Sequence, residues 1–90
     1  YINRGKKLYK EACDLQKNNN FEKVSVVIEE AIEAFFHSLR ILPVHEKVDE
    51  VYYYLVLSFR LINDRSRADH YMKNLKNYTP GSEYIDKIDS

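Results

Sequence analysis

Few residues in this 90-residue chain stand at spacings that could carry out chemistry. His45, Glu46 and Asp49 form half of the His-Glu-x-x-His pattern that binds zinc from a helix, but the second histidine is absent. His37 and His70 have no ligand spacing to this group, so we assign no metal. The chain also contains no glycine-rich phosphate loop and no local nucleophile signature. We therefore expect a protein that is not an enzyme and that needs no cofactor.

Two arginine and histidine pairs nevertheless share a spacing of five residues, Arg40 to His45 and Arg65 to His70. This spacing resembles the motif of the all-helical HEPN ribonucleases, in which the arginine and the histidine act on the scissile phosphate. Pro43 interrupts the first pair, whereas the second lies at the start of an expected helix. An HEPN-like, RNA-cleaving helical domain is therefore an alternative function, and a solvent-facing His70 is the simpler interpretation.

The composition indicates a small helical protein without a strong net electrostatic field. Hydrophobic residues make up 44% and charged residues 31% of the chain, and two glycines and two prolines leave little room for a turn-rich sheet. Fourteen basic residues balance fourteen acidic ones, so we expect no nucleic-acid partner. No apolar run approaches the roughly 20 residues of a membrane span, so we expect no membrane insertion. Cys13 is the single cysteine, which excludes an internal disulfide.

The first two helices are predicted by apolar residues that recur three and four positions apart. Residues 2–17 form the first helix, and the asparagines at 18–20 end it because Asn tolerates left-handed geometry. The second helix begins at about Phe21 and ends at Leu42, since Pro43 cannot continue a helix. Its broad apolar face must be covered on two sides, and it comprises Phe21, Val24, Ile28, Ala31, Phe35, Leu39 and Leu42.

Two more helices and a terminal cap follow in the second half. The third helix begins at Val48, and Asn63-Asp64 provides a stop followed by an N-cap for the fourth. After a Thr-Pro-Gly turn, Ser82 can cap a short last helix that covers the end of the stack. The inward face of the fourth helix is expected to comprise Ala68, Met72, Leu75 and Tyr78.

These elements predict an all-α fold of antiparallel helical hairpins within a single domain, residues 1–90. Residues 1–43 make an irregular hairpin with a long second helix, residues 46–80 make a regular hairpin, and residues 82–89 make a capping helix. The expected architecture is thus four main helices and a C-terminal cap.

Aromatic, leucine and small residues recur at fixed distances in the second hairpin, at Tyr52, Leu55, Phe59, Ala68, Met72 and Pro80. This spacing resembles the tetratricopeptide repeat (TPR), a helix–turn–helix unit of about 34 residues. The first hairpin fits the same offsets less closely, because Glu11 takes the usual leucine position. The resemblance implies a short solenoid. Since three or more such units usually stack, we expect the native protein to continue beyond this chain, or two copies to pair through apolar surface.

In TPR proteins, the first helix of each unit usually lines a concave groove that holds a peptide. The resemblance therefore implies an interaction or scaffold module whose partner is a protein or a peptide. Tyr9 and Cys13 stand where the carboxylate-clamp members carry Lys and Asn, which implies an aromatic groove of mixed charge. A purely structural spacer inside a larger assembly is the other alternative. The implied groove residues are Lys6, Tyr9, Cys13 and Gln16 on the first helix, and Glu50, Tyr53, Leu57 and Arg60 on the third.

Overall fold

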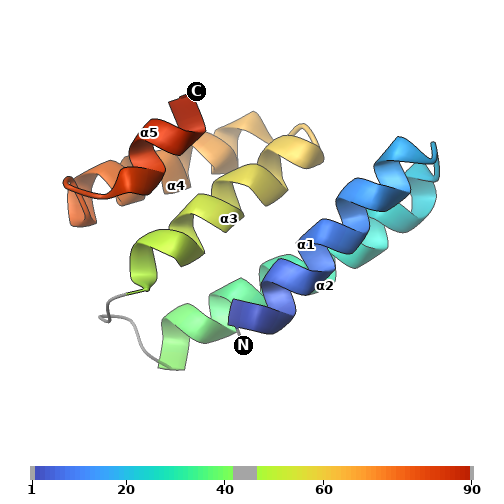
Figure 1. Ribbon diagram of the computed structural model, residues 1–90, viewed down its shortest axis with the longest axis horizontal. Helices are drawn as coiled ribbons and strands as arrows, with labels where there is room; N and C mark the ends of the chain where they lie inside the picture. The colour runs from blue at the N-terminus through green and yellow to red at the C-terminus, as the bar shows by residue number, and fades with distance from the viewer. Residues whose placement is uncertain (1, 42–46, 90) are drawn as a thin grey trace.

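The computed structural model describes residues 2–41 and 47–89, and in these segments it is built from helices (Figure 1). The described residues form no strand, and the expected all-α class is confirmed. The helices are α1 (Ile2–Lys17), α2 (Phe21–Ile41), α3 (Val48–Leu61), α4 (Arg65–Tyr78) and α5 (Glu83–Asp89).

The helices pack as two hairpins, α1 with α2 and α3 with α4. Helix α3 is central, because it also contacts α1, α2 and α5. In Figure 1, α1, α3 and α5 lie toward the viewer, whereas α2 and α4 lie behind them. The first helix of each hairpin and the short last helix therefore share one face of the molecule.

One hydrophobic core joins the two hairpins. Helix α2 contributes Val24, Ile28, Ala31 and Phe35 of its expected apolar stripe to this core, and Leu39 packs against it, as the spacing predicts. Helix α3 contributes a second stripe, and α4 contributes Ala68 and Leu75, with Tyr71 and Met72 packed against the core. The largest fully buried apolar side chains are Phe35, Phe59, Ile28, Leu55, Leu75, Val51 and Val56.

The turns inside the hairpins follow the local chemistry of asparagine and aspartate. Asn19 and Asn63 adopt left-handed backbone conformations with φ of 61° and 60°. After the second turn, the Asp64 carboxylate accepts a hydrogen bond of 3.2 Å from the backbone N–H of Arg67 and so caps α4. The expected helix stops and the expected N-cap at Asp64 are confirmed.

Helix α5 is anchored to α3 through its own cap. The Ser82 hydroxyl accepts a 3.1 Å hydrogen bond from the backbone N–H of Tyr84, and it donates a 2.6 Å hydrogen bond to the Asp49 carboxylate. Ile88 of α5 is buried in the hydrophobic core. The expected cap at Ser82 is confirmed, and the same hydroxyl also ties the cap to the start of α3.

Helix α1 approaches α2 closely because its buried residues are small. These residues are Gly5 and Ala12. A methyl group at Gly5 would lie 2.5 Å from Cε1 of Phe35, closer than real side chains come. The first hairpin therefore depends on a glycine that apolar periodicity does not reveal.

Two residues of the expected apolar faces are exposed instead. Phe21 is 58% exposed and Tyr78 is 69% exposed. They are the first residue of α2 and the last residue of α4, where fewer neighbouring residues are available to cover a side chain. The Tyr78 ring still stacks beside Tyr52 at 6.2 Å between centroids. The expected helix end at Leu42 and the corner at residues 43–45 lie outside the described residues.

Candidate functional site

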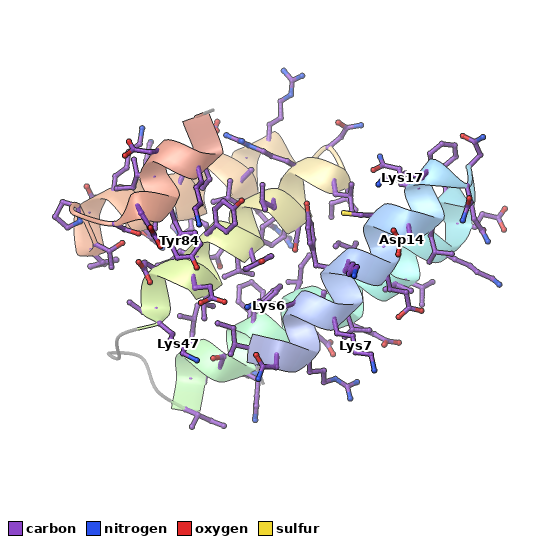
Figure 2. The ribbon with its side chains drawn as sticks, viewed as in Figure 1. Lys6, Lys7, Asp14, Lys17, Lys47 and Tyr84 are labelled. Carbon is purple, nitrogen blue, oxygen red and sulfur yellow. The ribbon has the colours of Figure 1, made fainter. Side chains whose placement is uncertain are left out.

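An open groove of about 610 Å³ runs between α1 and α3. One side of the groove is a long stretch of α1, and the other side carries an aromatic ring of α3. Figure 2 shows Lys6 on the side of α1 that faces α3, with Asp14 and Lys17 further along the same helix. The lining residues are Lys6, Lys7, Tyr9, Lys10, Cys13, Asp14 and Lys17 of α1, and Tyr54 of α3.

Four tyrosines form a continuous row across this face, and we call Tyr9, Tyr54, Tyr53 and Tyr84 the tyrosine row. Tyr9 meets Tyr54 edge to face with ring centroids 5.6 Å apart. Tyr54 meets Tyr53 in the same manner at 5.2 Å, and Tyr53 meets Tyr84 at 4.8 Å. The row therefore begins on α1, crosses α3 and ends on α5. Such ring pairs add about 0.5–1.5 kcal/mol each beyond the area that they bury.

The core fixes the position of the row. The ring of Tyr54 is stacked on fully buried Phe35 of α2, with an interplanar angle of 16° and a centroid distance of 5.7 Å. The four tyrosines are each half-buried, so part of each residue remains accessible to solvent. The row therefore rests on the core of the first hairpin at Tyr54.

An ion pair crosses the groove beside the row. The Lys6 ammonium lies 2.7 Å from the Glu50 carboxylate, and it lies 5.8 Å from the centre of the Tyr54 ring. The hydrogen bond with Glu50 is the main cause that raises the pKa of Lys6 above its usual value. Because the Lys6 side chain is 39% exposed, the ion pair adds little to the stability of the fold. Its main effect is to hold the Lys6 and Glu50 side chains in place beside the groove.

The rim of the groove on α1 is basic. Lys7, Lys10 and Lys17 are exposed, and Asp14 is the acidic residue among the groove-lining side chains. Since Glu50 already pairs with Lys6, the exposed rim presents an excess of positive charge to solvent. Such a rim favours negatively charged groups on whatever enters the groove.

The Tyr9 phenol at the floor of the groove is neutral at neutral pH. Burial raises the pKa of Tyr9 well above its ordinary value, and a hydrogen bond with the Cys13 side chain acts in the same direction. Cys13 is a half-buried free thiol. The floor therefore offers aromatic surface and weak hydrogen-bonding groups below the charged rim.

Five of the eight residues expected at the groove meet at this face. Lys6, Tyr9 and Cys13 line the groove itself. Glu50 joins them through its ion pair, and Tyr53 joins them through its contact with Tyr54.

The other three expected residues lie apart from these contacts. Gln16 is exposed and does not line the groove. Leu57 is half-buried on α3. Arg60 lines a separate hollow near the turn between α3 and α4, with Asn63 and Arg65.

Tyr54, Tyr84, Lys10 and Lys17 belong to this face although the sequence did not predict them there. The run Tyr52-Tyr53-Tyr54 does signal that rings point in several directions from α3. No local signal places Tyr84, because its contact with Tyr53 depends on how α5 crosses α3. Lys10 and Lys17 follow Lys6 at helical spacing, so the sequence of α1 alone could have placed them on the same face.

Arg65 and His70, the pair that the structure describes in full, do not line a common hollow. His70 is exposed, and its ring packs edge-on against Tyr71 at 4.9 Å. Arg65 lines the hollow near the turn, which His70 does not line. Arg40 is exposed on α2, and its companion His45 lies outside the described residues. Within residues 2–41 and 47–89, no three His, Cys, Asp or Glu side chains are grouped as a metal site.

Comparison with known proteins gives no relative: no family model matches the chain, and neither the curated proteins nor the solved structures contain a significant match. In the part of the chain that the structure describes, no helix has the length and apolarity to cross a bilayer.

Proposed function

We propose that this chain is a protein-interaction module of the TPR type, which holds a segment of a partner protein in the groove between α1 and α3. The tyrosine row carries this proposal, because it joins the first helices of both hairpins and α5 in one surface. Tyrosine offers a large contact area and a polar hydroxyl at a small cost in conformational entropy. A surface of this kind is typical of binding hot spots.

The basic rim supports an acidic partner segment. Exposed ion pairs contribute only about 0.2–1 kcal/mol each, so the lysines would select and orient the segment while the tyrosines supply most of the affinity. Protein is favoured over nucleic acid at this site. One face of Tyr54 is already stacked on Phe35, and base stacking needs free ring faces. The chain also has no net charge, so it lacks the overall positive field that draws a phosphate backbone to a protein.

Fluorescence polarisation tests the groove with a short fluorescein-labelled peptide rich in glutamate, leucine and phenylalanine. The double variant Lys10→Glu/Lys17→Glu reverses the charge of the rim and should weaken binding at least about tenfold. The matched control is Lys73→Glu/Lys76→Glu, which makes the same charge change at two exposed positions of α4.

Three outcomes would contradict the proposal. Equal weakening by both double variants would mean that only the net charge matters. Unchanged affinity in both would place the peptide elsewhere on the molecule. Absence of peptide binding by the wild-type chain would instead favour the structural spacer.

A further inference from the structure

Two helical stripes on the first hairpin have the same spacing and opposite charge. The basic stripe, on α1, comprises Lys6, Lys10, Cys13 and Lys17, all of which line the groove. The acidic stripe, on α2, comprises Glu22, Val26, Glu29 and Glu33. In each stripe the second, third and fourth residues follow the first by four, seven and eleven positions, so each stripe lies along one face of its helix.

The acidic stripe is solvent-exposed along its length. Its three glutamates are exposed, and Val26 is 59% exposed, which makes it one of the most exposed large apolar side chains of the described residues. The buried stripe of α2, which includes Ile28 and Phe35, points away from it into the core. Packing within the chain therefore leaves the acidic stripe available for an external contact.

The two stripes match position by position when the helices run antiparallel. Reading the acidic stripe forward and the basic stripe backward gives the same intervals of four, three and four residues. An antiparallel contact would then place every glutamate opposite a lysine and the exposed valine opposite the half-buried thiol. The facing pairs are Glu22 with Lys17, Val26 with Cys13, Glu29 with Lys10 and Glu33 with Lys6.

We infer that the groove between α1 and α3 receives α2 of a second copy of this chain, antiparallel to α1. This inference rests on the proposed function of the groove and names its occupant. The contact is heterologous, because the basic stripe of one copy meets the acidic stripe of the next. In an open chain of copies, the first and the last copy each keep one unpaired stripe. Further copies can therefore be added unless the assembly closes into a ring.

The contact is weak and sensitive to salt. Its ion pairs are solvent-exposed at the rim, where screening is strong above about 0.1 M salt. Lys6 can serve both Glu50 and a second carboxylate, since an ammonium group has three donors. The apolar part of the contact is Val26 above Cys13 and Tyr9. We therefore expect association to appear at low salt and high protein concentration.

Disulfide trapping tests the register directly. The wild-type chain carries one thiol, at Cys13, and the variant Cys13→Ser/Val26→Cys carries one at the acidic stripe. The two are mixed, with a size tag on one of them, and oxidised with copper-phenanthroline in air at low salt. A bond from position 13 to position 26 requires Cα atoms within about 7 Å, which only the proposed contact would hold. We expect the mixed dimer to exceed both homodimers.

The matched control moves the second thiol by one residue. Cys13→Ser/Ser25→Cys also places a thiol at an exposed position of α2, but about 100° around the helix from the stripe. It should form mixed dimer only at background level. In a Lys10→Gln/Lys17→Gln background, the yield from position 26 should fall, because losing two exposed ion pairs weakens association roughly 2- to 30-fold.

Equal trapping at positions 25 and 26, or trapping that is unaffected by the loss of the two lysines, would overturn the inference. Labelled-peptide binding on the same samples separates it from the proposed function. Peptide binding without position-specific trapping would refute the second copy as occupant and leave the groove intact. Loss of both peptide binding and position-specific trapping would also refute the groove as a binding site. Glu29→Gln/Glu33→Gln should reduce trapping while leaving peptide binding unchanged.

Discussion

Replacing Gly5 with alanine should destabilise the first hairpin, although alanine normally strengthens a helix. The added methyl carbon would meet three atoms of the Phe35 ring at 2.5, 2.8 and 2.8 Å. Phe35 is fully buried and stacked on Tyr54, so its ring cannot move away without disturbing the groove. The clash therefore extends from α1 to the floor of the candidate site.

The magnitude follows from two opposing terms. Overpacking a dense core costs about 1–3 kcal/mol, and a ring held on two sides places this case in the upper part of that range. The higher helix propensity of alanine relative to glycine offsets this cost by up to about 1 kcal/mol. The expected net loss is about 1–2 kcal/mol in the free energy of unfolding. For a domain of this size, that loss lowers Tm by roughly 5–15 °C.

Urea unfolding followed by circular dichroism measures this loss, and a double-mutant cycle tests its cause. Phe35→Leu removes the ring that the methyl group would strike. Gly5→Ala should therefore cost much less in the Phe35→Leu background than in the wild-type chain. Wild-type stability or better for Gly5→Ala would refute the packing argument, as would a cost that is identical in the two backgrounds.

Three further predictions concern single side chains. Burial raises the pKa of Tyr9, so the native phenol stays protonated while the unfolded one ionises above about pH 10, and stability should fall as pH rises through that region. Tyr9→Phe should reduce this alkaline loss in urea titrations at about pH 8 and pH 11; an unchanged loss would assign it to other groups. Ser58 is fully buried, and its hydroxyl has no hydrogen-bond partner among the described residues, so Ser58→Ala should raise unfolding free energy by about 1 kcal/mol. A clear decrease would mean that the hydroxyl has a partner. Asp64→Ala should lower unfolding free energy by about 1 kcal/mol through loss of the α4 cap, whereas Asp69→Ala, at an exposed position of the same helix, should change it little; similar losses in both would contradict the cap.

Much of the fold follows from chemistry that acts within a few residues. The helix period, the left-handed asparagines and the caps at Asp64 and Ser82 need only their neighbours in the chain, and the structure confirms each of them. The face of α2 that enters the core is predictable for the same reason. The exceptions, Phe21 and Tyr78, stand at helix ends, where burial depends on how far the neighbouring helix extends.

The sequence by itself determined an all-α chain of paired helices, and the spacing of three residues puts Lys6 and Tyr9 on one face of α1. Only the tertiary structure decided that Tyr54 closes the groove, that Tyr84 extends the tyrosine row, and that Arg60 lies in a separate hollow. The physical reason is that residue spacing specifies the direction of a side chain around its own helix. It does not specify the distance or the crossing angle between helices. Those depend on close packing at points such as Gly5 and Phe35, which bring together residues far apart in the chain.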